Sequence, residues 1–570
     1  MRPSLEPARG HRDNRATDRM TLTREADIRG STDAEAADPA APVARVLAFA
    51  DRHRRWVYAG IVLLYLAGYT GSWPVSSDSA LYAALGRNLY EGRGYTYQGE
   101  PHTWVEPGTP LLVALSFTIG GPEAFWPVMA VMVGLSLACL ALFHAIVRLN
   151  HGRPTAVLLT AALAVTETFY RYGYFLFTDV PFLAAVLVLL LGYELIVHRR
   201  GRASVAAGWA LFAAGSFLLP ALRPVWATIL GGFVVGAVWQ IVRGRRRAAH
   251  GLMLAVVLVA VVGFRAVDPR RAGVDQPTHI EAHVSAMATE HRAFVLRRMV
   301  VEHLPQLFER TVPQALLGVQ TVPGLNSAFT AAVVAACLAL VRVRPTWAMV
   351  VAATLAQLAF HLPKERYLVP VLPIVLIAVW RAVPWAAARV PARHRAVALG
   401  AAGAVVLLAN VVAIGRYVVT RHREAALLAP YTFGDDDDES ALPAVAAALR
   451  DQVGDGPLVV AQGARELHYF SRCRTVAPLT SRRVPPSPRE LAAFGRQLAQ
   501  EPALYVVLPG RWTEELVRQV GIEVGPPVPL GGGLSLHRAH VVPGSPTPHP
   551  SSVTAGVMRV PRESRAEATP

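Results

Sequence analysis

Long apolar segments recur along the first three quarters of this chain, and the loops between them alternate between arginine-rich and arginine-poor. The chain of 570 residues is 53% hydrophobic and only 17% charged, a composition typical of membrane proteins. About eleven of its segments approach the length of roughly 20 residues that a helix needs to cross a bilayer. We therefore predict an all-α polytopic membrane protein with spans near 56–74, 124–147, 154–170, 179–197, 203–220, 224–242, 249–266, 326–342, 345–362, 367–383 and 396–416.

The arginines at alternate loops predict the orientation of the spans. They include Arg52, Arg54, Arg55, Arg148, Arg153, Arg199, Arg200, Arg202, Arg243, Arg245, Arg246, Arg247, Arg342, Arg344, Arg389, Arg393 and Arg395. Such loops stay in the cytoplasm under the positive-inside rule. This pattern explains much of the net charge of +16, so we expect no nucleic-acid partner. We predict a multi-pass protein of the plasma membrane with its N-terminus inside.

Composition divides the chain into four parts. Residues 1–50 are polar and lack the apolar core of a signal peptide, which predicts a disordered cytoplasmic tail. Residues 51–419 form the membrane domain, with exported loops at 75–123 and 267–325. Residues 420–541 alternate short apolar runs with amphipathic stretches, typical of a small α/β domain, here expected outside the cell. Residues 542–570 are rich in Pro, Ser and Arg and are expected to be disordered.

Two carboxylates fall at the exported ends of spans. Asp78 follows the first span and precedes apolar residues at helical spacing, which predicts a short surface helix over 79–91. Asp179 begins the fourth span. Either residue could simply cap its helix, because Asp is favoured at that position. Alternatively, a carboxylate at the membrane surface can accept a proton from a hydroxyl group. Charges at a bilayer edge are costly and are commonly functional.

Three cations lie in exported turns, where the positive-inside rule leaves few. Arg223 stands in LLPALRPVWA, and Lys364 and Arg366 stand in AFHLPKERYLVPVLP. Guanidinium and ammonium groups bind phosphate oxygens well, so a polyanionic ligand is one explanation. Lys364 is the only lysine among the 56 basic residues, which hints that an ammonium group is required there. The alternative is that these side chains reach toward the head groups of membrane lipids.

The sequence predicts no cofactor and no metal site. Cys139 and Cys337 lie in apolar spans and Cys473 is isolated, so neither a disulfide framework nor zinc-site spacing is present. The acidic run 435–439 could bind a divalent cation, but such a run is more commonly a solvated linker. The histidines of the second exported loop have no compact ligand spacing.

The segment from Asp78 through YAALGRNLYEGRGYTY to EPGTPLL resembles the first exported loop of the membrane GT-C glycosyltransferases. Within that superfamily it is most similar to bacterial relatives of the protein O-mannosyltransferases and of the lipid A aminoarabinose transferases. TDVPF, LRPVW and KERYLVPVLP resemble later motifs of the same group, and the likeness extends over residues 56–415. Many relatives carry two adjacent acids after the first span, whereas here Asp78 stands between two serines.

The resemblance implies transfer of a sugar from a polyprenyl-phosphate-linked donor to an acceptor hydroxyl, with inversion, on the exported face. Asp78 would be the catalytic base, and Asp179 would orient the acceptor or support Asp78. The donor phosphate would be bound by Arg223, Lys364, Arg366 and Tyr367, with Glu106 as a secondary candidate.

Other classes of function remain open at this stage. An O-antigen-ligase-like transferase would suit the large exported loop, and a polyprenol-linked glycan transporter or flippase would also need basic lipid contacts. A transporter would be expected to have inverted halves and charges midway along its spans, which the sequence lacks. A scaffold subunit of an envelope assembly would leave Asp78 dispensable. The sugar and the acceptor, whether glycan, lipid or protein, are not specified by the sequence.

Overall fold

A computed structural model gives the structure of the chain. It describes residues 41–198, 201–271, 297–318, 324–360, 363–427, 431–433, 442–454, 456–461, 464–476, 488–508, 517, 519–520, 522–531 and 534–542. The acidic run 435–439 and residues 543–570 of the expected tail 542–570 lie outside these residues. So do His279, His283 and His291 of the second predicted exported loop.

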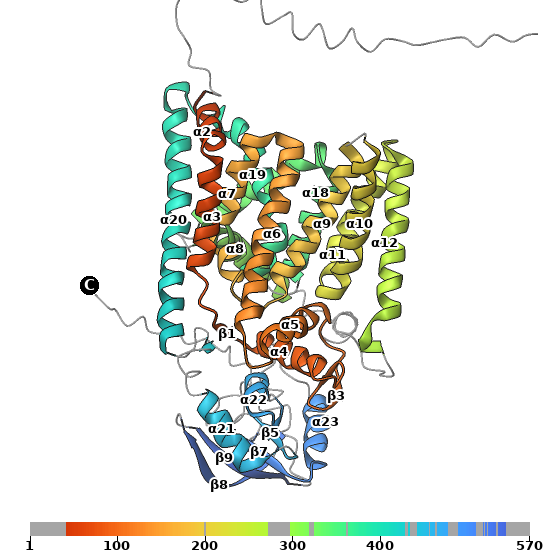
Figure 1. Ribbon diagram of the computed structural model, residues 1–570, viewed down its shortest axis with the longest axis vertical. Coiled ribbons are helices and arrows are strands. Elements are labelled where there is room, and N and C mark those ends of the chain that lie inside the picture. The colour runs from red at the N-terminus through yellow and green to blue at the C-terminus, as the bar shows by residue number, and fades with distance from the viewer. Residues whose placement is uncertain are drawn as a thin grey trace, which may run out of the picture.

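Most of the described chain is a bundle of apolar helices standing side by side (Figure 1). Seven helices among the described residues are long and apolar enough to cross a membrane. They are α6 (Trp126–His151), α9 (Asp179–His198), α10 (Arg202–Leu222), α12 (Arg247–Val267), α17 with η4 (Leu325–Arg342), η5 with α19 (Glu365–Ala387) and most of α20 (Ala392–Leu427). Shorter helices of the bundle are α3 (Arg54–Ala67), α7 (Arg153–Ala164), α11 (Trp226–Val242) and α18 (Pro345–Phe360).

Several predicted boundaries are wrong. The first helix ends at Ala67, and residues Trp73–Val75 of the predicted span 56–74 form strand β1. The predicted span 154–170 is divided into α7 and the short helix α8 (Glu167–Tyr172). Apolar composition alone does not separate the buried strand β1 from a span, whereas Glu167 and Arg171 already make α8 less apolar than a span.

Two predicted domain limits also need correction. Helix α2 (Ala41–Arg52) begins within the range 1–50 that we expected to be disordered. Its apolar residues recur at helical spacing, and the polar residues around them conceal that pattern when the tail is judged by composition. Helix α20 continues to Leu427, so the membrane domain passes the predicted boundary at 419.

A layer of short elements covers one end of the bundle. It contains α4 (Ser77–Tyr90), the small hairpin of β2 (Thr96–Tyr97) and β3 (Glu100–Pro101), and α5 (Gly108–Gly120). The predicted helix over 79–91 is present as α4, which runs from Ser77 to Tyr90 and has most of its residues buried. Its N-cap is Ser76, whose hydroxyl accepts from the Ser79 backbone N–H while the Ser79 hydroxyl accepts from the Ser76 N–H. Asp78 is therefore not the cap, and its carboxylate is free to bond elsewhere.

Residues 297–318 of the second predicted loop form a nearly continuous helical segment. It comprises η2 (Met299–His303), α15 (Leu304–Gln306), η3 (Leu307–Thr311) and α16 (Val312–Leu317). This segment is joined to the turn that contains Lys364, because the Thr311 hydroxyl donates to the Pro363 carbonyl at 2.6 Å. A second contact joins it to α18, where the buried His303 ring lies 3.1 Å from the Ala359 carbonyl oxygen.

The C-terminal part is a mixed α/β domain, as predicted. Its five-stranded sheet has the order β6-β5-β7-β9-β8, with β5, β6 and β7 parallel and β9 antiparallel to both neighbours. The strands are β5 (Leu458–Val460), β6 (Arg474–Val476), β7 (Leu504–Leu508), β8 (Ile522–Gly531) and β9 (Leu534–Val541). The helices are α21 (Leu442–Val453), α22 (Ala464–Ser471) and α23 (Pro488–Ala499).

This domain lies against the short-element layer, with α22 facing α4 (Figure 1). The Arg87 guanidinium of α4 donates to the Tyr469 hydroxyl at 2.6 Å and lies 4.3 Å from the centre of that ring. Strand β4 (Tyr431–Phe433) pairs in parallel with β1. We call this end of the bundle the domain end. The opposite end, beside α2, is called the arginine-rich end.

Candidate active site

Asp78 lies at the domain end with an arginine on each carboxylate oxygen. Arg366 bonds Oδ2 at 2.9 Å, and Arg465 of α22 bonds Oδ1 at 3.2 Å. The Asp78 side chain nevertheless keeps 36% of its surface exposed. A carboxylate in the first turn of a surface helix is thus both held by cations and open to solvent.

The charges around Asp78 keep its carboxylate ionised. Burial raises the pKa of the Asp78 carboxyl, but the positive charges of Arg366, Arg465 and Arg223 outweigh burial. The pKa therefore lies below its ordinary value. At neutral pH this group can accept a hydrogen bond or a proton, as a general base must.

Asp179 and Arg223 form a buried ion pair next to this carboxylate. Asp179 begins α9 and Arg223 follows the last residue of α10, so the two helices bring the charges together at one end of an antiparallel pair. Glycines allow the close packing: a methyl group at Gly215 would lie 2.6 Å from the Leu189 backbone nitrogen. The Asp179 side chain is only 1% exposed, which favours a positioning role over direct proton transfer.

Aromatic rings hold the two arginines in place. The Arg223 guanidinium lies 4.6 Å from the centre of the Tyr367 ring. Arg366 lies 4.7 Å from the Phe177 ring and 5.0 Å from the Tyr367 ring, and it donates to the Tyr367 hydroxyl at 3.2 Å. Arg–aromatic contacts of this kind fix a guanidinium without neutralising it.

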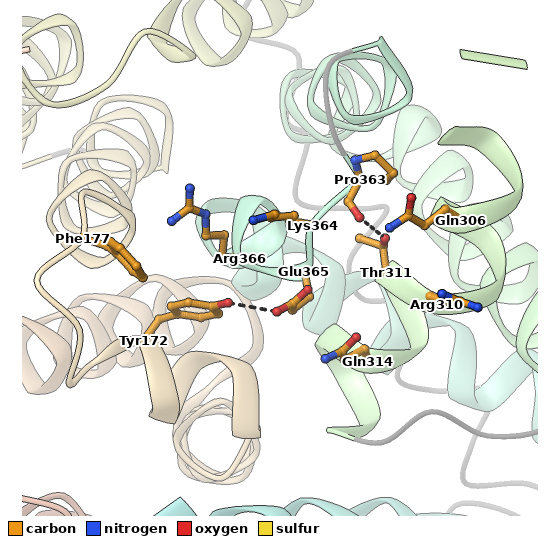
Figure 2. A pocket seen from close by; sticks show the side chains of 10 residues that line it. All are labelled: Tyr172, Phe177, Gln306, Arg310, Thr311, Gln314, Pro363, Lys364, Glu365 and Arg366. Atoms are coloured by element: carbon orange, nitrogen blue, oxygen red, sulfur yellow. Dashed lines mark hydrogen bonds between the residues drawn. The ribbon is translucent and has the colours of Figure 1, made fainter. Parts of the chain in front are cut away.

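Lys364 lines a cavity of about 370 Å³ beside these residues. Figure 2 shows Lys364 and Arg366 between Phe177 on one side and the helical segment with Gln306, Arg310 and Thr311 on the other. Lys364 and Arg310 are exposed, and neither forms an ion pair with any residue that the structure describes. Two cations thus face a cavity without a matching carboxylate.

Glu365 stands between Lys364 and Arg366 in the sequence, but its carboxylate bonds other residues. Its Oε1 accepts from the Tyr172 hydroxyl at 2.9 Å, a bond drawn in Figure 2, and from Arg171 at 3.0 Å. Arg171 also pairs with Glu167 at 3.1 Å. These bonds tie the turn that contains Lys364 to α8.

Glu106 lies apart from this group, in a separate buried cluster. It accepts from Arg270 at 3.1 Å, and Arg270 also binds Asp268 at 2.7 Å. Burial raises the pKa of Glu106 to about 7, with Arg270 opposing that effect. The structure thus brings Asp78, Asp179, Arg223, Arg366 and Tyr367 together with Lys364 at the adjoining cavity, but not Glu106.

Sequence reasoning missed two cations of the site. Arg465 belongs to the C-terminal domain, where nothing in the local sequence marks it as unusual. Arg310 lies within the predicted loop 267–325, and because that loop contains five other arginines, the sequence does not single it out. No group of three His, Cys, Asp or Glu side chains that could hold a metal ion occurs within the described ranges.

The architecture matches solved membrane glycosyltransferases. The structure of ArnT from Cupriavidus metallidurans bound to undecaprenyl phosphate matches with a TM-score of 0.52 at 15% identity, covering 85% of this chain and 97% of that one. This chain shares the fold of that structure. A second match is the oligosaccharyltransferase AglB from Archaeoglobus fulgidus in complex with an inhibitory peptide and a dolichol-phosphate. Its TM-score is 0.50 at 12% identity, covering 80% of this chain and 69% of that one.

No family model matches the sequence, and no curated protein matches it. The likeness to known proteins is therefore one of fold alone.

Proposed function

We propose that this protein is an integral membrane glycosyltransferase that uses a polyprenyl-phosphate-linked sugar and an acceptor hydroxyl. The observation that carries the proposal is the meeting, at one end of the bundle, of an ionised, accessible carboxylate and cations that form no ion pair with any described residue. Asp78 supplies the carboxylate, and Lys364 and Arg310 supply cations that face a cavity. Two structures with the same fold contain polyprenyl phosphates, namely undecaprenyl phosphate and dolichol-phosphate.

In the proposed reaction, Asp78 accepts the proton of the acceptor hydroxyl as its oxygen attacks the anomeric carbon. The bond from that carbon to the phosphate oxygen breaks, and the electron pair leaves with the phosphate. Lys364, Arg310 and Arg366 lie where they could stabilise the negative charge of the departing lipid phosphate. Direct displacement without a covalent intermediate inverts the configuration at the anomeric carbon.

Asp179 and Arg223 position the residues that contact Asp78. Their buried pair positions Arg223 against the Tyr367 ring, and Tyr367 in turn accepts a bond from Arg366. Arg366 then fixes one oxygen of Asp78. A change at Asp179 should therefore act through the placement of Asp78 and of the cations.

The proposal is tested with purified protein reconstituted in liposomes and a panel of undecaprenyl-phosphate sugars. Release of undecaprenyl phosphate that depends on an envelope-lipid or glycan acceptor supports it. Comparison of envelope glycans by mass spectrometry with and without the gene would identify the sugar and the acceptor. If no donor of the panel is consumed and the glycans are unchanged, the proposed function is wrong.

We also propose that the domain end lies outside the plasma membrane and the N-terminus inside. The positive-inside rule supports this orientation, because Arg153 and Arg344 lie at the opposite end. Cysteines 139, 337 and 473 are buried, which permits labelling at added cysteines. A membrane-impermeant thiol reagent applied to intact cells should label Glu100→Cys and not Arg245→Cys. The reverse result would overturn the orientation.

The transporter alternative finds less support in the charge distribution. The buried ion pair Asp179–Arg223 and the pair Asp78–Arg366 both lie at the domain end of the bundle rather than midway along it. If the protein were a flippase, Asp78→Asn would be expected to keep moving lipid. If it is a transferase, the same variant should lose turnover.

A further inference from the structure

Helix α22 of the C-terminal domain contacts both ends of α4 through one face. Arg465 and Tyr469 are four residues apart, so they project from the same side of α22. Arg465 bonds Asp78 in the first turn of α4, and Tyr469 accepts from Arg87 in its last turn. The domain is therefore placed directly over the helix that carries the proposed base.

The two arginines on Asp78 are held very differently. Arg366 is 15% exposed and lies against the Phe177 and Tyr367 rings. Arg465 is 35% exposed and bonds Oδ1 through one nitrogen. Exposed ion pairs contribute little to stability and exchange readily with solvent or ligand. Of the two contacts on Asp78, the one from the C-terminal domain is the easier to displace.

A carboxylate bonded on both oxygens by guanidinium groups is a poor proton acceptor, because each cation stabilises its charged form. Arg465 also occupies a hydrogen-bonding position on Oδ1 that an acceptor hydroxyl would use, although 36% of the Asp78 side chain remains exposed. We infer that Arg465 is a positioning residue that keeps Asp78 inactive until the acceptor hydroxyl replaces it on Oδ1. This inference rests on the proposed function and adds to it a role for the C-terminal domain.

The benefit of such a gate would be protection of the donor from water. If Oδ1 were open, a water molecule could take the place of the acceptor. Its oxygen would form the bond to the anomeric carbon, its proton would pass to Asp78, and the bond to the lipid phosphate oxygen would break. The sugar would be lost to hydrolysis rather than transferred.

The kinetic test uses Arg465→Ala in the full-length protein and the undecaprenyl-phosphate sugar that the panel above identifies. Without acceptor, Arg465→Ala should release free sugar about fivefold faster than wild type, the scale expected for one exposed ion pair. With acceptor, its KM for the acceptor should fall. Arg465→Lys should restore slow hydrolysis. The matched control is Arg474→Ala, which removes an arginine of similar exposure that pairs with Glu501 inside the same domain.

A second measurement needs no donor. In protein reconstituted in nanodiscs, Asp78→Asn should increase hydrogen exchange in residues 464–471, because Arg465 loses its charged partner. Asp51→Asn, at the arginine-rich end, should leave that segment unchanged. A protein that transfers sugar normally but shows neither effect overturns the gate alone. A protein that uses no donor overturns the proposed function, and the gate with it.

Discussion

Buried, paired charges occur at both ends of the bundle, but among the described residues only the domain end has cations that face a cavity without an ion pair. At the arginine-rich end, Glu194 of α9 is fully buried and accepts from Arg344 at 3.3 Å, and Arg344 also binds His198 and Asn150. At the domain end, Lys364 and Arg310 face a cavity with no ion pair to any described residue. Burial and charge therefore do not by themselves identify a functional site. Uncompensated charge beside an accessible carboxylate is the more specific indication.

The comparison predicts first that the carboxylate of the domain end is required for turnover. Asp78→Asn should reduce transfer by about 10²- to 10⁴-fold, because the amide cannot accept the hydroxyl proton. Initial rates in liposomes with a saturating donor measure this loss. Asp51→Asn removes a carboxylate paired with Arg153 at 2.7 Å at the opposite end and should keep wild-type rates. Equal rates for the two variants would remove Asp78 from the mechanism.

The second prediction concerns the unpaired cation. Lys364→Ala should weaken binding of undecaprenyl phosphate by about tenfold or more, the cost of losing one charged hydrogen bond. Lys364→Arg should recover part of the affinity. Arg342→Ala, an exposed cation of the arginine-rich end, serves as the matched control. Binding is measured by microscale thermophoresis in detergent, and unchanged affinity in Lys364→Ala would contradict the phosphate site.

The third prediction concerns the arginine-rich end, where a substitution should lower stability and leave transfer unchanged. Glu194→Gln removes a fully buried carboxylate and leaves the half-buried Arg344 without it, which should cost about 3 kcal/mol of stability and lower the Tm. Transfer at a temperature well below the Tm should be retained. Thermal unfolding in detergent, followed by tryptophan fluorescence, gives the Tm. Loss of transfer by a folded Glu194→Gln protein would contradict a purely structural role.

The smallest effect is expected at Glu106, which belongs to the domain end but is paired like the charges of the other end. Its pKa is raised by burial to about 7 in the folded protein, above the ordinary value for a glutamate. The folded state therefore holds a proton that the unfolded chain releases, so the Tm should fall as the pH rises from about 4.5 to about 7. Glu106→Gln should flatten this slope and retain transfer. If the Tm of wild type and of Glu106→Gln changed equally with pH, Glu106 would not be the group responsible for the pH dependence.

Much of the membrane architecture could be predicted from sequence, because apolar length reports directly on the helices that can span a membrane, and alternating arginine-rich loops predict which helix ends lie together. The helix α4 and the C-terminal α/β domain were also predictable from periodicity. Counting spans also predicted which charged residues lie at the same end of the bundle, because every second loop between membrane-spanning helices emerges at the same end. The residues placed together in this way are Asp78, Asp179, Arg223 and Arg366.

The pairing of charges could not be predicted in the same way. Which carboxylate meets which arginine depends on the packing of helices far apart in the chain. Thus Arg223 pairs with Asp179, whereas Glu106 pairs with Arg270. Arg465 reaches Asp78 across 387 positions of sequence, through a domain whose placement no local pattern specifies. The end of α3 at Ala67 could not be predicted because the buried strand β1 continues the apolar segment beyond it.

The parallel pairing of β1 with β4 brings the segment that follows α20 close to Asp78. Strand β1 ends at Val75, three positions before Asp78, and its partner β4 begins just beyond the last membrane helix. Deleting everything after Leu427 would strip β1 of that partner, and Asp78 of Arg465, in one cut. Loss of activity in such a shortened protein would therefore be weak evidence that the chemistry lies in the deleted segment.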